Sequence, residues 1–207
     1  MAKTGPQFVL GVDLDGVCAD FYGGLRLIAA EWLGVDERDL TQEVTYGLPQ
    51  WGIKKTGARA YDKLHRFAVT QRNLLGNLKP IPGAAAVLRR LSAKNIRVRI
   101  ITHRLFIKHF HQTAVQQTVE WLDRYDFPYW DLCLLADKAA VGANTYVEDS
   151  PSNVERLRKD NHDTIVFTNS TNRHLRGPRA DTWEEVEGMV LDRLNKWHAG
   201  KKQLAGV

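Results

Sequence analysis

The sequence has few of the features that mark secreted, membrane-spanning or disulfide-bonded proteins. Its 207 residues include two cysteines, Cys18 and Cys133, without the paired spacing of a disulfide framework. Its apolar runs are far shorter than the ~20 residues that cross a bilayer, and the first residues are not followed by the apolar stretch of a secretory signal. We therefore expect a cytoplasmic protein with reduced thiols and no membrane span.

Acidic residues are almost absent from the middle of the chain. Residues 44–119 hold 14 lysines and arginines and a single acid, Asp62, whereas residues 1–43 and 120–207 each carry a net negative charge. A basic middle suits a phosphorylated ligand, a nucleic acid or an acidic partner. Solvated helix surfaces are the commoner place for lysine and arginine, so the charge pattern alone does not decide between these interpretations.

The rest of the composition is that of an ordinary globular protein, with 43% apolar and 26% charged residues. Short apolar runs predict strands buried on both faces, at 8–12, 96–101, 131–135, 145–147 and 164–167. Helix-like stretches lie between or after them, at 84–94, 113–125, 152–161 and 182–197. This alternation predicts an α/β fold with a Rossmann-like parallel sheet and helices on both of its faces.

One segment interrupts the alternation between the first two strands. Residues 20–79 contain two helix-like stretches, 21–33 and 58–73, around an aromatic loop with glycine and proline. Some sixty residues is too long for a simple crossover. We therefore expect a helical cap at 20–79, inserted after strand one, and a core made of residues 1–19 and 80–207.

Polar residues follow four of the predicted strands at the point where each strand ends. In chain order they are Asp13 and Asp15, then Thr102 and His103, then Lys138, and finally Glu148 and Asp149. In an open parallel sheet, the carboxyl ends of the strands form the ligand crevice. The sequence therefore predicts that these side chains meet at one site.

The residue types at this site are suited to phosphoryl transfer. Carboxylates at Asp13, Asp15 and Asp149 would repel one another unless a cation neutralised them, and oxygen ligands with a phosphate favour Mg²⁺. One aspartate can attack phosphorus while the other protonates the leaving oxygen and later activates water. Thr102 can hydrogen-bond a phosphoryl oxygen, and Lys138 can offset the charge of the nucleophile and phosphate.

The four polar segments resemble, in order, the four motifs of the haloacid dehalogenase (HAD) superfamily. More narrowly, the sequence resembles the cytosolic and mitochondrial 5′(3′)-deoxyribonucleotidases. The matching stretches are residues 12–21, 78–84, 118–122 and 137–149, with weaker matches at 167–169 and 172–175. Four ordered motifs with an insertion in the expected gap make a specific pattern, which covers most of the chain.

The resemblance implies a Mg²⁺-dependent phosphomonoesterase that acts on nucleoside monophosphates through an aspartyl-phosphate. By matched position Asp13 is the nucleophile and a metal ligand. Asp15 is the general acid and base and binds the metal through its backbone carbonyl, and Asp149 completes the protein ligands. The acid at Asp15 favours ester hydrolysis over the phosphoenzyme chemistry of ion pumps. The resemblance also suggests a homodimer.

The remaining site residues are assigned from the same resemblance or left open. Thr102 and Lys138 would hold the phosphate, and Phe21 matches an aromatic that packs on the nucleotide. Glu148 either contributes to the metal site or supports it by holding Lys138 or a backbone amide. His103 would reach the phosphate because of its place beside Thr102.

Two departures from the family concern the substrate pocket. His103 and Arg104 stand where the nucleotidases have Ser-Pro, and Leu74 and Leu75 occupy a stretch that is rich in phenylalanine in the family. The phosphate chemistry is unaffected, but the base and sugar preference is left open, as is the choice between a 5′ and a 3′ phosphate.

Three alternatives compete with the nucleotidase interpretation. The first is the same chemistry on another small phosphate, such as a sugar phosphate. The second is a basic protein that binds nucleic acid through residues 44–119 and has lost catalysis. This alternative is less favoured because the acids at Asp13, Asp15 and Asp149 are intact. The third is a phosphatase that processes the ends of polynucleotides, which is less favoured because a cap of this size restricts access to small ligands. A zinc site at His103, His109 and His111 is also less favoured, because their spacing is not that of a standard ligand set.

Overall fold

The computed structural model describes residues 7–105 and 107–205, so residues 1–6, where a secretory signal would begin, lie outside the described part. Its centre is a six-stranded parallel sheet in the order β3-β2-β1-β4-β5-β6. The strands are β1 (Val9–Val12), β2 (Arg97–Thr102), β3 (Asp131–Leu134), β4 (Thr145–Glu148), β5 (Thr164–Phe167) and β6 (Arg179–Ala180). Five of them were predicted, and β6 is too short to leave a pattern in the sequence.

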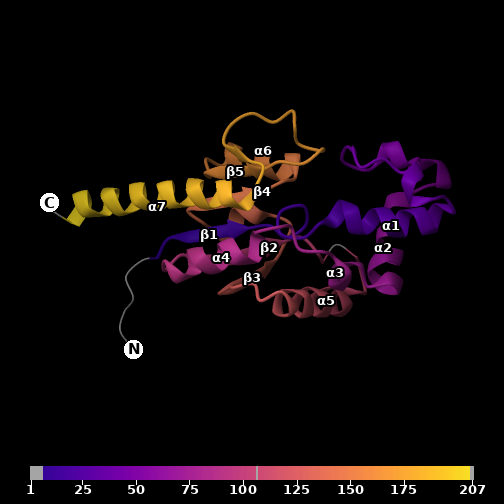
Figure 1. Ribbon diagram of the computed structural model, residues 1–207, viewed down its shortest axis with the longest axis horizontal. Helices are drawn as coiled ribbons and strands as arrows, with labels where there is room; N and C mark the ends of the chain where they lie inside the picture. Colours follow the sequence, from indigo (N-terminus) through magenta and orange to yellow (C-terminus); the bar gives the residue numbers. More distant parts are fainter. Residues whose placement is uncertain (1–6, 106, 206–207) are drawn as a thin grey trace.

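Helices cover both faces of this sheet. They are α4 (Ala84–Ala93), α5 (His111–Arg124), α6 (Pro151–Lys159) and α7 (Trp183–Ala205), with a short 3₁₀ helix, η4 (Lys138–Val141). Helices α4 and α7 pack together on one face, whereas α6 and η4 cover part of the other (Figure 1). The Rossmann-like α/β fold predicted from the alternation is confirmed.

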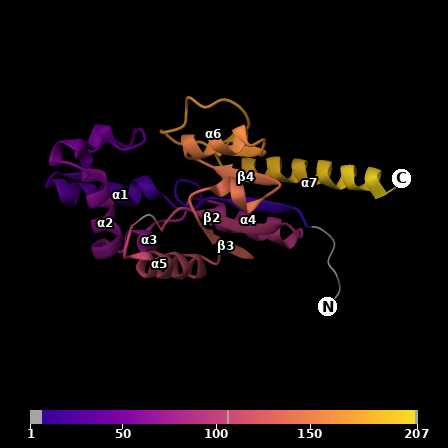
Figure 2. The same cartoon turned by 180° about the vertical axis from the view of Figure 1, so that it is seen from behind.

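The long segment between β1 and β2 is helical, as predicted. It contains α1 (Phe21–Leu33), α2 (Ala60–Arg72) and α3 (Leu74–Asn77), with 3₁₀ helices η1 (Glu37–Asp39), η2 (Pro49–Trp51) and η3 (Ile53–Thr56). Residues 20–79 are called the insertion below. Figures 1 and 2 show α1 and α2 at the end of the molecule opposite the C-terminus, beyond the carboxyl end of β1.

Hydrogen bonds tie the two ends of the insertion together and fasten it to the sheet. The backbone N–H of Asp20 donates to Lys79 O at 2.9 Å, and that of Ile81 donates to Cys18 O at 2.7 Å. These bonds hold the exit from β1 beside the return into α4, so the insertion begins and ends next to the loop that carries Asp13 and Asp15.

Helix α5 provides a second attachment for the insertion. Gln117 Nε2 donates to Val69 O at 2.8 Å, and Trp121 Nε1 donates to Leu78 O at 2.8 Å. Arg124 Nη1 donates to the carbonyl of Gly76 in α3 at 2.7 Å. The α2–α3 half of the insertion is therefore fixed against the helix that follows β2.

None of the helices that the structure describes has the length and apolarity needed to cross a membrane. Helix α7 extends past the predicted end at Trp197 to Ala205. Lys201 Nζ lies 3.8 Å from the centre of the Trp197 ring, one turn earlier, and this cation–π contact favours the added helical turn.

Candidate active site

The carboxyl ends of the strands and the insertion enclose a cavity of about 720 Å³, called the active-site cavity below. The predicted site residues that line it are Asp13, Asp15, Phe21, Thr102, His103, Lys138 and Asp149. Residues from four separate segments therefore meet at one place, as their positions at the strand ends predicted. Glu148 lies beneath this cavity, with 1% of its surface exposed.

The Lys138 ammonium lies at the floor of the cavity and forms ion pairs with two carboxylates. Its Nζ lies 2.7 Å from Asp13 Oδ2 and 2.6 Å from Glu148 Oε2. Burial alone would lower the pKa of Lys138, but the two carboxylates outweigh it and raise that pKa above its ordinary value. Lys138 is therefore a fixed positive charge beside the carboxylate of Asp13.

Glu148 accepts three hydrogen bonds from the protein. Its Oε2 binds Lys138, and its Oε1 accepts the backbone N–H groups of Asp149 at 3.2 Å and Ser150 at 3.0 Å. These contacts orient the turn after β4 and hold Lys138, which is the supporting alternative considered for this residue.

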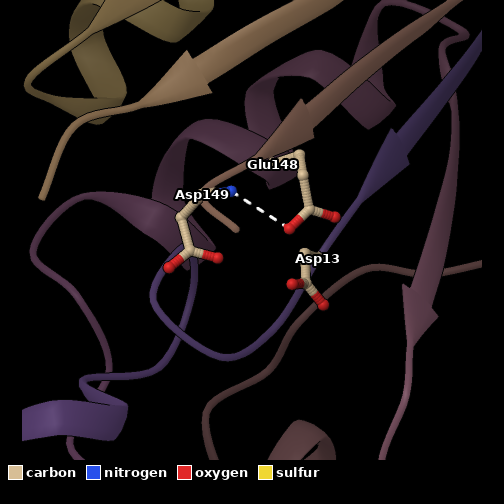
Figure 3. Close-up of side chains that lie close together, drawn as sticks. All are labelled: Asp13, Glu148 and Asp149. Atoms are coloured by element: carbon tan, nitrogen blue, oxygen red, sulfur yellow. Dashed lines mark hydrogen bonds between the residues drawn. The ribbon is translucent and has the colours of Figure 1, made fainter. Parts of the chain in front are cut away.

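The carboxylates of Asp13, Glu148 and Asp149 form a buried acidic cluster (Figure 3). One oxygen from each lies within 4.8 Å of the others. Asn169 Nδ2 donates to Asp149 Oδ2 at 2.7 Å, and Asn172 Nδ2 donates to the backbone oxygen of Asp149 at 2.8 Å. Of these two asparagines from the loop after β5, Asn169 thus orients the third carboxylate of the cluster, and Asn172 fixes the backbone that carries it.

The buried acidic cluster holds more negative than positive charge. Burial raises the pKa of Asp13 to about 8, repulsion from Glu148 adds to the increase, and Lys138 opposes it. Burial also raises the pKa of Asp149 well above its ordinary value, again with repulsion from Glu148. Three carboxylates face one ammonium, so full ionisation would leave two negative charges uncompensated.

The donor chemistry fits a hard divalent cation. All the side-chain ligand atoms of the acidic cluster are carboxylate oxygens, which favour Mg²⁺ over softer metals. Glu148 already accepts three hydrogen bonds, against two for Asp13 and one for Asp149, so Asp13 and Asp149 have more capacity for a metal. Within the residues that the structure describes, the three histidines at 103, 109 and 111 do not assemble a metal-binding group.

Gly16 brings the loop after β1 against this cluster. Its φ is +81°, a left-handed conformation that glycine adopts without strain. A Cβ at this position would lie 2.1 Å from Asp149 Oδ2 and 2.6 Å from its carboxyl carbon. Only a glycine therefore lets the loop after β1 approach the Asp149 carboxylate this closely.

Asp15 lies on the other side of this loop and is held by a residue that sequence reasoning missed. Arg104 donates from Nε to Asp15 Oδ2 at 3.0 Å and from Nη2 to Asp15 Oδ1 at 2.6 Å. Arg104 was noted as a departure from the family, without a role. Its partner is 89 residues away along the chain, so no local pattern in the sequence signals the pair.

Aromatic side chains of the insertion line the outer part of the cavity. The His65 ring stacks against two aromatic rings, that of Phe21 with 5.8 Å between ring centres and that of Tyr61 with 6.2 Å. Burial lowers the pKa of His65 to about 4, so this ring is neutral at pH 7. Tyr61 and His65 are four residues apart on α2, and this spacing places them on one helical face. Tyr22 and Tyr46 also line the cavity.

His103 lies at the mouth of the cavity, next to the buried Thr102. Partial burial lowers the pKa of His103, and the charge of Lys138 contributes to the decrease. The ring is therefore biased toward its neutral form beside the position that a phosphate would occupy.

Half of the cations in the basic middle pair with carboxylates of the chain. Seven of its 14 cations pair with carboxylates among the described residues, namely Arg59, Arg72, Arg89, Arg90, Arg97, Arg99 and Arg104. Another, Lys54, lines the active-site cavity. This distribution weakens the case for an extended surface that binds nucleic acid.

Solved structures define the fold class. A HAD-superfamily hydrolase from Geobacter sulfurreducens aligns with a TM-score of 0.54 and 14% sequence identity, over 89% of this chain and 100% of that chain. The fold is therefore that of the HAD superfamily, with the acidic cluster and Lys138 at the carboxyl ends of the strands.

Sequence comparisons then identify the family. The model for "5′ nucleotidase, deoxy (Pyrimidine), cytosolic type C protein" matches residues 7–195. The "Putative 5′(3′)-deoxyribonucleotidase" of Chlorobaculum tepidum is 57% identical over 89% of this chain and 90% of its own length. The human mitochondrial 5′(3′)-deoxyribonucleotidase is 27% identical over 84% of this chain and 80% of its own length. The chain belongs to this NT5C family of 5′-nucleotidases, as the resemblance predicted.

Proposed function

We propose that this protein hydrolyses the phosphate ester of deoxyribonucleoside monophosphates and releases a nucleoside and inorganic phosphate. Membership of the NT5C family supports this activity, which is that of a phosphoric monoester hydrolase. The observation that carries the mechanism is the contact of Lys138 with Asp13 beside Asp149, at the floor of a cavity with aromatic walls.

Asp13 is the nucleophile in this proposal. Its Oδ2 is held by Lys138, and its Oδ1 accepts the backbone N–H of Leu14 at 2.8 Å, so the carboxylate is fixed at the end of β1. It forms a bond to phosphorus while the bond from phosphorus to the ester oxygen breaks. Thr102 and Lys138 bind the oxygens of the transferring group, and His103 contributes a contact at the mouth of the cavity.

Asp15 moves the protons. It gives a proton to the departing nucleoside oxygen, and the resulting carboxylate then takes a proton from water. The oxygen of that water attacks the phosphorus of the aspartyl-phosphate, which releases inorganic phosphate and restores Asp13. General acid and base catalysis of this kind contributes about 10²- to 10⁴-fold to a rate.

The cofactor in this proposal is Mg²⁺, held by Asp13, Asp149 and the backbone carbonyl of Asp15. When bound, it supplies positive charge to the acidic cluster and to the transferring phosphate. Glu148 supports the site by fixing Lys138 and the turn that carries Asp149.

Substrate selection falls to the insertion. We propose that residues 20–79 form a cap over a core of residues 1–19 and 80–207, with Phe21 packing on the base. Stacking of a base on an aromatic ring is worth about 1–3 kcal/mol. The free thiols of Cys18 and Cys133 agree with a cytoplasmic location, and the family resemblance suggests a homodimer.

Phosphate release from a panel of esters tests this function. The panel contains ribo- and deoxyribonucleoside 5′- and 3′-monophosphates together with sugar phosphates, each assayed with Mg²⁺ and with EDTA. We expect metal-dependent release from deoxyribonucleotides, which Asp13→Asn abolishes. Asp137→Asn is the matched control, because Asp137 is an exposed carboxylate beside Lys138 that lies outside the cavity lining. Release from sugar phosphates alone would refute the nucleotidase assignment.

A further inference from the structure

The Arg104 guanidinium donates two hydrogen bonds to the Asp15 carboxylate, from Nη2 to Oδ1 at 2.6 Å and from Nε to Oδ2 at 3.0 Å. The arginine follows β2 and the aspartate follows β1, so the pair joins two neighbouring loops at the carboxyl edge of the sheet. A two-point contact between guanidinium and carboxylate fixes the plane of the carboxylate as well as its position.

The Arg104 side chain is itself buried and held by helix α5. It is 3% exposed, and its Nη1 donates to Thr118 Oγ1 at 3.1 Å. The Thr118 hydroxyl donates to Ala114 O within α5 at 2.6 Å. Because α5 is fastened to the insertion through Gln117, this anchor has a fixed place between the sheet and the insertion.

The arrangement leaves one side of Asp15 open to substrate. The Asp15 side chain is 26% exposed and that of Arg104 is 2% exposed, while both residues line the active-site cavity. Each carboxylate oxygen has two lone pairs, and the guanidinium uses one on each oxygen. The remaining lone pairs are available on the accessible side of the carboxylate.

We propose that Arg104 is the positioning residue for Asp15, and that it holds the carboxylate in the orientation needed to reach the ester oxygen. This inference rests on the proposed function, because it takes Asp15 as the group that transfers the proton. Lysine at this position would keep the charge but lose the planar fork that sets the angle of the carboxylate.

The leaving group provides a specific readout for this role. A nucleoside alkoxide needs a proton as the ester bond breaks, whereas p-nitrophenolate leaves without one. Since kcat/KM reports the steps up to phosphoryl transfer to Asp13, a misplaced Asp15 lowers kcat/KM for nucleotides and spares that for p-nitrophenyl phosphate. A merely structural defect, or loss of a phosphate contact, lowers both.

The experiment measures kcat/KM for a deoxyribonucleotide, glycerol 2-phosphate and p-nitrophenyl phosphate in the full-length protein with Mg²⁺. For Arg104→Gln we expect about a 100-fold loss on the two alkyl esters and less than about a threefold loss on the aryl ester. Arg104→Lys should restore part of the activity on the alkyl esters. Thr118→Val, which removes the anchor and keeps the ion pair, should show the same selectivity with a smaller loss.

Arg99→Gln is the matched control for loss of an ion-paired arginine. Arg99 lies on β2, the strand that precedes Arg104, and pairs with Asp131 at 2.8 Å, outside the active-site cavity. Thermal unfolding of each variant separates a loss of stability from a loss of catalysis, and we expect Arg99→Gln to leave the ratio between esters unchanged.

A double variant shows whether Arg104 acts through Asp15. If it does, Arg104→Gln added to Asp15→Asn costs no further activity on the alkyl esters, because residues that act as one unit are not additive. Equal losses on alkyl and aryl esters, or a further loss in the double variant, would overturn the proposal. Turnover of glycerol 2-phosphate without turnover of any nucleotide would refute the nucleotide assignment alone, since the ratio between esters still tests Arg104.

Discussion

Replacing Lys138 with methionine removes the ammonium that compensates the acidic cluster while keeping an unbranched side chain of similar length. Lys138 is 5% exposed and contacts Asp13 at 2.7 Å and Glu148 at 2.6 Å. The variant would bury these carboxylates, together with Asp149, without a counter-charge. Removing one partner of a buried ion pair costs about 3–5 kcal/mol. For a chain of this length, the melting temperature of the metal-free protein should fall by about 6–20 °C.

The size of this loss depends on pH, and the sign follows from the cluster. At pH 5 Asp13, with its pKa raised to about 8, already carries a proton in the folded protein, so less charge is left uncompensated. At pH 8 a larger fraction of the cluster is ionised, and the missing ammonium costs more. The loss of stability in Lys138→Met is therefore greater at pH 8 than at pH 5.

Urea unfolding in EDTA at the two pH values measures this difference directly. Lys196→Met is the control, because that lysine pairs with Asp192 on the exposed surface of α7, and its removal should leave the unfolding transition unchanged. A loss below about 1 kcal/mol at pH 8, or a loss that is larger at pH 5, would refute the electrostatic reasoning.

Three further predictions follow from the geometry. In EDTA, the wild-type protein should lose stability as pH rises from about 4 to about 8, because folded Asp13 holds its proton over a range in which the unfolded carboxyl has lost it, and Mg²⁺ should reduce this slope in urea titrations. Gly16→Ala should lower kcat by about 100-fold and weaken the response to Mg²⁺, because its Cβ meets Asp149, whereas Gly188→Ala, which meets nothing within 4 Å, should leave both unchanged. Phe21→Leu should raise KM for nucleotides by about tenfold and leave KM for p-nitrophenyl phosphate unchanged, if the ring stacks on the base.

The elements of the core were predictable because burial on both faces leaves continuous apolar runs in parallel strands. Residues 8–12 and 164–167 carry this signal clearly. The two-residue strand β6 has no periodicity to detect, since it gains its place only by pairing with Val166 and Phe167 of β5. The last turns of α7 read as a polar tail in the sequence and depend on a cation–π contact for added stability.

The site was predictable wherever it follows from strand ends. Asp13, Thr102, Lys138 and Asp149 each stand at or just after the carboxyl end of a strand, and the parallel topology brings them together. Contacts between distant loops leave no such signal. Asn169 contacts Asp149 because the loop that follows β5 folds back toward the end of β4. Arg104 and Asp15 likewise meet from two different loops, after β2 and β1.

Trapping the covalent intermediate tests the central claim most directly. The Asp15→Asn variant is mixed with Mg²⁺ and p-nitrophenyl phosphate carrying a radiolabelled phosphate, quenched in acid, and digested to locate the protein-bound label. The account predicts stoichiometric label on Asp13, because the phenolate leaves without a proton and the water step has lost its base. It predicts none in the Asp13→Asn variant. An unlabelled Asp15→Asn protein, or label that persists after Asp13→Asn, would contradict it.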